Sequence, residues 1–413
     1  MQFIRQNMFY VVLIALVVVT AGALVFLNMS VSGKVDGREE VRGRASRDVQ
    51  NAGTGQPVNP TILANRRKFL DTLRGGAKGV VDSCVDWNRR NLVDPNHMIS
   101  AVGDGKPVTA FPIDPNQYDK LAYNFSNDYL GKLVALIKTI SPTSPPTDDE
   151  IKVKADQIAR ILAASAPASA PAREGAAPAG EDAVTKATEY LKAQKAAEGL
   201  IYADASVLDR YFDKPETLIS KKKMWEAQVN LWVLSDVLAA VNATNKQSLL
   251  GGGSLARERS VVNAAVKRLV KIDVTEQYFT THGAMARSGG VSGAVMNLTQ
   301  RTSTAEYDVI HYNLTVIMPF RYLPLLERKL MEQNFHTVLK VDIAEAPEAA
   351  TGRYYYGADP VFQVTIHGEM LLLAAWERGT WEDGKWKYPP LMPVEVIDEL
   401  RKEGVPVADA GPR

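Results

Sequence analysis

An uncharged apolar run near the N-terminus constrains this chain more than any other feature of its sequence. From Met8 to Met29 the residues MFYVVLIALVVVTAGALVFLNM include no charged side chain, and about 20 apolar residues let a helix cross a bilayer. The alternative is a cleaved signal peptide with AGA at 21–23 as its cleavage site. Because the apolar run continues beyond that site, we expect a retained transmembrane anchor at 8–29, preceded by a stub at 1–7.

The charges that flank this run leave the orientation of the anchor open. Arg5 is the only basic residue before the run, whereas five basic residues follow it between positions 34 and 47. Counted by the positive-inside rule, the C-terminal side is cytoplasmic. Long domains, however, cross the membrane largely regardless of such charges.

Composition argues against several classes of function. The chain has 413 residues, with 48 basic against 47 acidic side chains and no basic cluster interleaved with aromatic residues. This balance gives no sign of a nucleic-acid partner. The single cysteine, Cys84, allows neither an internal disulfide nor a cysteine-based zinc site. The length is enough for two or three small domains.

A heptad pattern follows a polar tether at residues 30–60, within a helical or coiled-coil region at 61–140. Apolar residues repeat every seven positions from Leu63 to Cys84 and from Leu73 to Trp87, with Arg66 at one site of the second series. This spacing predicts a coiled-coil seam. The predicted interaction residues are Leu63, Leu70, Leu73, Val80 and Trp87. One amphipathic helix of a small globular domain fits the pattern equally well.

A run rich in alanine and proline divides the chain. ASAPASAPAREGAAPAGED at 164–182 cannot bury a core. We interpret the shorter polar stretch SPTSPPTDDE at 141–150 as prone to disorder as well. The sequence therefore predicts a linker with helical segments at 141–220, with a domain boundary in or beside it.

A strand–helix–strand unit is the clearest secondary-structure signal. Apolar residues alternate from Ile310 to Met318 and again from Thr337 to Ile343, which is the period of a strand with one buried face. Between these strands, three leucines of LPLLERKLM have the spacing of one helix face. Asn334 is the expected stop of this helix.

Placed in order, the segments from 221 to 376 predict helix, strand, strand, helix, strand, strand. The first helix contains WEAQVNLWVLSDVL, and a short helix over 261–269 leads into the first strand. The strands are expected near 270–279, 307–318, 336–343 and 361–373. The expected fold class is α+β, with an N-terminal transmembrane helix, a helical middle region and a C-terminal αββαββ domain at 221–376. Its antiparallel sheet would carry both helices on one face. Residues 377–413 are expected to form a hairpin, with an Asp383-Gly384 turn, and a tail.

The sequence shows no pattern of catalytic residues. No two of the five histidines have the helical spacing of a zinc protease, and GGVSG at 289–293 misses the spacing of a nucleophile elbow. His311 and His367 fall on strand faces opposite the apolar stripes, and His336 begins a third strand. Solvent-facing positions are one interpretation, and a metal or proton site is the other. We assign no catalytic, cofactor-binding or metal-ligating residue and expect a protein that is not an enzyme.

Three tryptophans, Trp376, Trp381 and Trp386, recur at five-residue steps before Tyr388. Such a series is typical of cross-strand pairs that hold a hairpin together. It would also suit a sugar- or peptide-binding surface. An envelope-anchored glycan- or peptide-binding module is therefore the alternative function.

The predicted architecture resembles the PilO-like and GspM-like proteins of type IV pilus and type II secretion machines. These are bitopic inner-membrane proteins with one transmembrane helix, a coiled-coil stalk and a periplasmic ferredoxin-like domain in αββαββ order. The resemblance rests on the anchor and on the elements between 221 and 373, well under half of the chain. The glycine-rich tether and the long region 61–220 depart from the family. WEAQVNLWVLSDVL with VNAAVKRLVKIDV also looks like membrane-anchored proteins of planctomycete-type bacteria with no assigned function.

The resemblance implies a non-enzymatic scaffold that aligns or supports a pilus or secretion apparatus. It places the chain in the inner (cytoplasmic) membrane with the C-terminal domain in the periplasm. The implied partners are the chain itself or a similar bitopic membrane protein, met through the ferredoxin-like domain and the seam at 63–87. Residues 8–29 would insert into the lipid bilayer. The resemblance implies neither a cofactor nor a nucleic-acid partner.

Overall fold

The computed structural model describes residues 59–89, 100–103, 106–109, 111–165, 179–250, 258–274, 299, 301, 303–347 and 352–402. The chain divides into two units, Met1–Val81 and Asp82–Arg413. The predicted stub and anchor and nearly all of the tether lie outside the described residues, as do the alanine- and proline-rich run at 166–178 and the tail from 403. Within the described ranges, no helix is both long and apolar enough to cross a membrane. The transmembrane element of the expected fold class is therefore absent from the fold that the structure describes.

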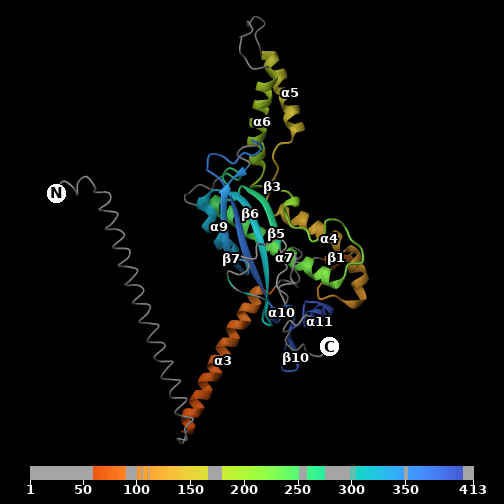
Figure 1. Cartoon of the computed structure of the whole chain (residues 1–413), viewed down its shortest axis with the longest axis vertical. Helices are drawn as coiled ribbons and strands as arrows, with labels where there is room; N and C mark the ends of the chain where they lie inside the picture. The colour runs from red at the N-terminus through yellow and green to blue at the C-terminus, as the bar shows by residue number, and fades with distance from the viewer. Residues whose placement is uncertain are drawn as a thin grey trace, which may run out of the picture. The chain divides into compact units, whose positions relative to one another are not determined.

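Helix α3 runs from Pro60 to Asn88 and begins where the sequence predicts (Figure 1). The Asn59 side chain accepts a hydrogen bond from the Thr61 backbone N–H at 2.9 Å. A proline follows this cap at the first helical position, where its missing N–H costs nothing. Residues 60–81 belong to the first unit, and the last turns of the helix belong to the second. An antiparallel pair follows, β1 (Ser100–Gly103) with β2 (Lys106–Thr109).

A six-stranded mixed sheet forms the centre of the second unit, in the order β3-β4-β5-β6-β8-β7 (Figure 1). The strands are β3 (Pro142–Thr143), β4 (Ile201–Tyr202), β5 (Arg268–Val274), β6 (Tyr307–Met318), β7 (Phe335–Glu345) and β8 (Phe362–Leu373). Strands β3, β4 and β5 pair in parallel, whereas β5, β6, β8 and β7 pair antiparallel. The longest pairing joins β6 to β8, with Tyr307 opposite Leu373 and Met318 opposite Phe362.

The expected fold class is wrong in the size and type of its sheet. A small ferredoxin-like domain with an antiparallel sheet was expected at 221–376, but the sheet has six strands and is mixed. Its two additional strands, β3 and β4, come from the predicted linker. Each is only two residues long, which is too short to show the alternation that identifies a strand.

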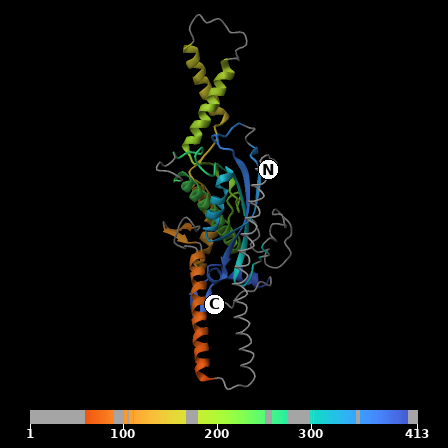
Figure 2. The same ribbon diagram turned by 90° about the vertical axis from the view of Figure 1, so that its left-hand side faces the viewer.

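Helices α7 (Lys221–Leu250) and α9 (Leu323–Met331) cover one face of the sheet (Figures 1 and 2). Helix α7 is buried on nearly all sides, and its two tryptophans, Trp225 and Trp232, pack edge to face with ring centres 5.6 Å apart. The buried residues of α7 include polar side chains as well as apolar ones, and these polar groups bond to neighbouring segments. Helix α4 (Tyr118–Lys138) packs against α7 and places Phe125 and Tyr129 in the same core. Helix α9 ends near Asn334, which has a positive φ of 44°, as the sequence predicts.

Two helices occupy the predicted linker, α5 (Asp148–Ser165) and α6 (Ala179–Glu198), and they pack against each other as a two-helix arm (Figures 1 and 2). A capping box starts α5: the Thr147 hydroxyl accepts from the Glu150 N–H at 3.2 Å, and the Glu150 carboxylate accepts from the Thr147 N–H at 2.9 Å. Glu150 also pairs with Lys195 of α6 at 2.9 Å. SPTSPPTDDE is thus ordered, contrary to its interpretation as disorder-prone.

The helix expected over 261–269 does not form, because side chains of α7 fix this backbone in another conformation. Asn245 accepts from the Val266 N–H at 2.7 Å and donates to the Val266 carbonyl at 3.1 Å. Ser248 accepts from the Ala265 N–H at 3.1 Å. These bonds use the backbone groups that a helix would need, and β5 begins directly afterwards at Arg268.

Short elements complete the second unit. They are α10 (Ala374–Glu377), β9 (Thr380–Glu382), β10 (Lys385–Tyr388), α11 (Val394–Lys402) and the 3-10 turns Pro115–Gln117, Ala205–Val207 and Phe320–Tyr322. The expected hairpin is present as β9 and β10, with positive φ angles of 52° at Asp383 and 78° at Gly384. Two positive φ angles are what the tightest hairpin turn requires. Helix α11 is tied to α7 by the ion pair of Lys222 with Glu399 at 2.6 Å.

Candidate functional site

The five predicted seam residues all lie on helix α3, and their side chains are between 42% and 65% exposed. The neighbouring Ile62, Phe69 and Val81 are exposed as well. Trp87, in the last turn, makes an edge-to-face contact with Phe335, with ring centres 4.8 Å apart. The structure therefore brings the seam together as one apolar stripe that the described residues leave largely open.

The three predicted tryptophans do not form one surface. Trp376 lies in α10 rather than in the hairpin and is only 2% exposed; its indole N–H donates to Asn88 at 2.8 Å, and its ring packs on the edge of Trp232. Trp381 and Trp386 face each other across β9 and β10, edge to face, with ring centres 5.2 Å apart. This is the cross-strand pair that stabilises a hairpin.

The histidines of the sheet lie in three separate environments. His311 and His367 are on the face opposite α7 and α9, as the sequence predicts, but His311 is only 4% exposed, so the solvent-facing interpretation is wrong for it. His311 is buried opposite Glu369, and burial lowers the pKa of its imidazole. His367 contacts Asn313 at 2.7 Å and Asp342 at 2.9 Å. Among the residues that the structure describes, no group of three or more His, Cys, Asp or Glu side chains is arranged to hold a metal ion.

His336 belongs to a buried polar chain that sequence reasoning missed. Its Nε2 lies 3.1 Å from the Asp236 carboxylate of α7, and its Nδ1 lies 3.0 Å from the Tyr312 hydroxyl of β6. Asn334 donates to the same carboxylate at 2.9 Å. When Nε2–H donates to Asp236 and Nδ1 accepts from the Tyr312 hydroxyl, each of these groups has a hydrogen-bond partner. These hydrogen bonds link β6 and β7 to α7.

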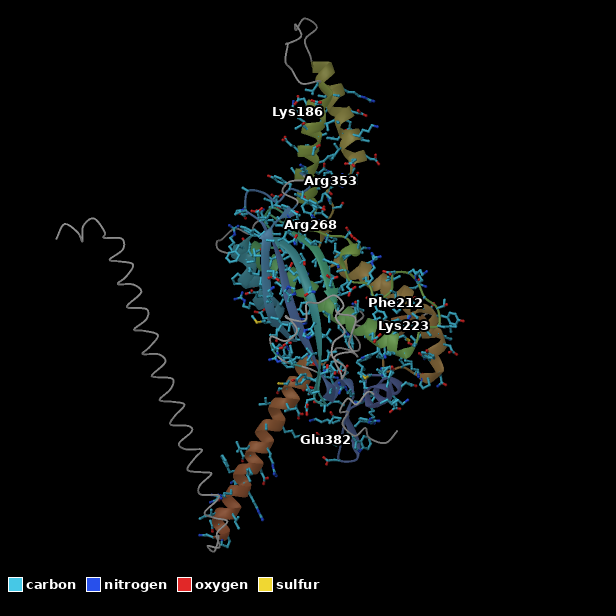
Figure 3. The ribbon with its side chains drawn as sticks, in the orientation of Figure 1. Lys186, Phe212, Lys223, Arg268, Arg353 and Glu382 are labelled. Atoms are coloured by element: carbon cyan, nitrogen blue, oxygen red, sulfur yellow. The ribbon has the colours of Figure 1, made fainter. Side chains whose placement is uncertain are left out.

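A cavity of about 260 Å³ lies beside the start of α7, and sequence reasoning missed it too. Its walls come from the segment after the second 3-10 turn, from α7 and from the ends of β5 and β6. The lining residues are Asp209, Arg210, Tyr211, Phe212, Lys223, Glu226, Val229, Asn230, Val274 and Ile310. Phe212 and Lys223 mark the cavity in Figure 3. Two of the lining residues, Asp209 and Glu226, are acidic, and two, Arg210 and Lys223, are basic.

Four polar lining residues, Asp209, Tyr211, Glu226 and Asn230, form the polar wall of this cavity, and hydrogen bonds hold them in place. The Asp209 carboxylate accepts from the Val274 N–H at 2.9 Å, and the Asn230 amide lies 3.4 Å from the same oxygen. Asn230 in turn accepts from the Tyr129 hydroxyl at 2.7 Å. The Tyr211 hydroxyl bonds to the Glu226 carboxyl group.

Burial controls the ionisation of the groups in and behind the polar wall. It raises the pKa of the Glu226 carboxyl above its ordinary value, while Tyr211, Lys222 and Lys223 oppose the shift. Burial also raises the pKa of the Tyr129 phenol, so Tyr129 remains a hydrogen-bond donor. A carboxyl group with a perturbed pKa beside a cavity is a recognised mark of a functional site.

No family model matches the chain, and no curated protein matches it either. One solved structure, a crystal structure from Akkermansia muciniphila, matches with a TM-score of 0.25 and 8% identity over 63% of this chain and 96% of that chain. A likeness at this level supports no conclusion about function. The comparisons therefore add nothing to the pilus or secretion role that the resemblance implies.

Proposed function

We propose that the chain is a non-enzymatic scaffold protein that self-associates through helix α3. The observation that carries this proposal is the apolar stripe of α3, in which all five seam residues are exposed. Exposed apolar stripes of this kind mark sites of association. Complete burial of a leucine or valine side chain contributes about 1.5–3 kcal/mol, so half-exposed seam residues have roughly half of that still to gain.

A second copy of the chain is the occupant that best suits the stripe. A seam that repeats every seven residues packs against a helix with the same repeat, and an identical helix supplies it. The sole cysteine, Cys84, occupies a seam position of the same series as Leu63 and Leu70. In a parallel pair, the two copies of each seam position would lie next to each other.

The glycan- or peptide-binding alternative has less support. It relied on three tryptophans, and Trp376 is buried in the core. Trp381 and Trp386 already use their rings on each other. Binding at this hairpin stays a prediction that no specific observation favours.

Cysteine cross-linking of the full chain tests the pairing directly. In a Cys84→Ser background, Leu70→Cys places a thiol on the seam, and Asp71→Cys places one on the next position, which faces away from it. A short thiol-reactive cross-linker should join two copies of the Leu70→Cys chain and should join those of Asp71→Cys far less. Equal cross-linking of both variants, or of neither, would contradict a parallel seam.

Charge substitution gives an independent measurement. Leu73→Asp introduces a carboxylate into the seam, whereas Thr72→Asp adds the same charge on the exposed side of the same turn. Sedimentation velocity should show a monomer for Leu73→Asp at concentrations where the wild type and Thr72→Asp are dimers. A wild type that sediments as a monomer at high concentration would refute self-association.

A further inference from the structure

We infer that the cavity beside the start of α7 binds a small zwitterion with an apolar body, of the class of free amino acids with aliphatic or aromatic side chains. This inference is independent of self-association, because the cavity lies wholly in the second unit and none of its lining residues belongs to α3.

The charges around the cavity are those that a zwitterion requires. Asp209 and Glu226 supply two carboxyl groups, and Arg210 and Lys223 supply two cationic groups, to one open-sided cavity. Both cationic residues are exposed, and Lys223 also pairs with Glu216 at 3.0 Å. An ammonium group would pair with the carboxyl groups and a carboxylate with the cationic groups, with charge-assisted hydrogen bonds.

Glu226 is the group best placed to recognise an ammonium ion. One of its oxygens is engaged by the Tyr211 hydroxyl, and the carboxyl group is partly buried beside the cavity. Burial raises its pKa because the charged form loses hydration. A bound ammonium would restore a favourable interaction to the charged form, which makes the site selective for a cation at this position.

Four of the other lining residues are apolar. Phe212, Val229, Val274 and Ile310 come from four different segments and close around the same space. They would cover an aliphatic or aromatic body, which small-molecule sites bury against apolar side chains. The volume of about 260 Å³ lies below the usual range for drug-sized ligands, roughly 300–1,000 Å³, so it suits a compact molecule.

The polar wall is preorganised for binding. Asp209 is fixed by the backbone of Val274 and by Asn230, which is itself fixed by the Tyr129 hydroxyl. Tyr129 also accepts from the Tyr211 backbone N–H at 3.2 Å. Groups that are already ordered lose little conformational entropy when a ligand arrives.

Isothermal titration calorimetry on the full chain, with three probes of the same carbon skeleton, tests the inference without any mutation. L-leucine carries both charges, leucinamide lacks the carboxylate, and 4-methylpentanoate lacks the ammonium. We expect L-leucine or its aromatic counterpart L-phenylalanine to bind at least tenfold more tightly than the matching single-charge probes. Equal binding of a single-charge probe, or no binding of any apolar amino acid at millimolar concentration, would overturn the assignment.

Two variants identify the groups responsible. Glu226→Gln removes the negative charge, and Arg210→Ala removes a cation; each should weaken binding of the amino acid at least tenfold. Glu395→Gln is the control, because this exposed carboxylate pairs with Lys221 outside the cavity and should leave binding unchanged. If Glu226→Gln binds the amino acid like the wild type while its circular dichroism is also unchanged, the ammonium assignment is wrong.

Discussion

At Gly368, the addition of a single methyl group should lower stability strongly. Gly368 lies in β8 directly opposite Tyr312 of β6, and the Tyr312 ring packs over it. A Cβ atom added at this position would lie 2.5 Å from the Tyr312 hydroxyl oxygen and closer still to the ring carbon that bears it. Tyr312 is 1% exposed, so its ring has no free space into which to move.

The cost of Gly368→Ala follows from these contacts. Overpacking of a well-filled core costs about 1–3 kcal/mol. Displacement of the ring would also break the bond between Tyr312 and His336, worth about 1 kcal/mol. We therefore expect a loss of about 2–4 kcal/mol, a large part of the roughly 5–15 kcal/mol that typically stabilises a domain.

Urea unfolding followed by circular dichroism measures this loss, with Gly131→Ala as the matched control. Nothing in the described structure lies within 4 Å of a Cβ at Gly131, which is in helix α4. The same change there should stabilise by about 1 kcal/mol, because alanine favours a helix over glycine. Tyr312→Val should remove most of the cost of Gly368→Ala. A Gly368→Ala chain as stable as the wild type would refute the reasoning.

Three further predictions concern buried polar groups. Asn88→Leu removes the amide that bonds the Leu371 carbonyl, the Leu373 N–H and the Trp376 indole N–H. Because these groups lose their hydrogen-bond partner, the free energy of unfolding in urea should fall by about 2–4 kcal/mol. A loss below about 1 kcal/mol would contradict this. Burial raises the pKa of the Glu377 carboxyl from 4.5 to about 8. Between these two values the folded chain keeps a proton on Glu377 that the unfolded chain releases. The free energy of unfolding should therefore fall as pH rises from about 4.5 to 8, by up to about 5 kcal/mol. Glu377→Gln should flatten this dependence, and the prediction fails if urea midpoints at pH 5 and pH 8 differ equally in both chains. His336→Leu should cost about 1.5–3 kcal/mol, because the buried Asp236 carboxylate loses one hydrogen-bond donor. Asp236→Leu in the same chain should recover part of this loss, and a simple addition of the two losses would argue against their coupling.

The sequence predicts those parts of the fold whose signal is local and long. The apolar alternation from Ile310 to Met318 lies within strand β6, and Asn334 marks the end of α9 because an asparagine tolerates the left-handed conformation. The pairing of the α3 seam with a second helix stays a prediction.

The elements that the sequence does not predict depend on distant partners. Asn245 overrides the helical tendency of 261–269 from 21 residues away. Asp236 and His336 are 100 residues apart, and the cavity draws on segments from Asp209 to Ile310, so no spacing could reveal them. Helix α5 is different, because Thr147 and Glu150 form a capping box that the sequence shows and that a search for this motif would have found.

The two-helix arm leaves the sheet and returns to it between neighbouring strands. Strand β3 ends just before the arm and β4 begins just after it, with Pro142 opposite Ile201. At the return point, a Cβ on Gly199 would lie 2.8 Å from the Ser141 carbonyl oxygen, so only glycine lets the two ends approach so closely. The arm is therefore an exchangeable insertion: evolution or an engineer can shorten it, lengthen it or graft another hairpin in its place, provided that this junction is retained.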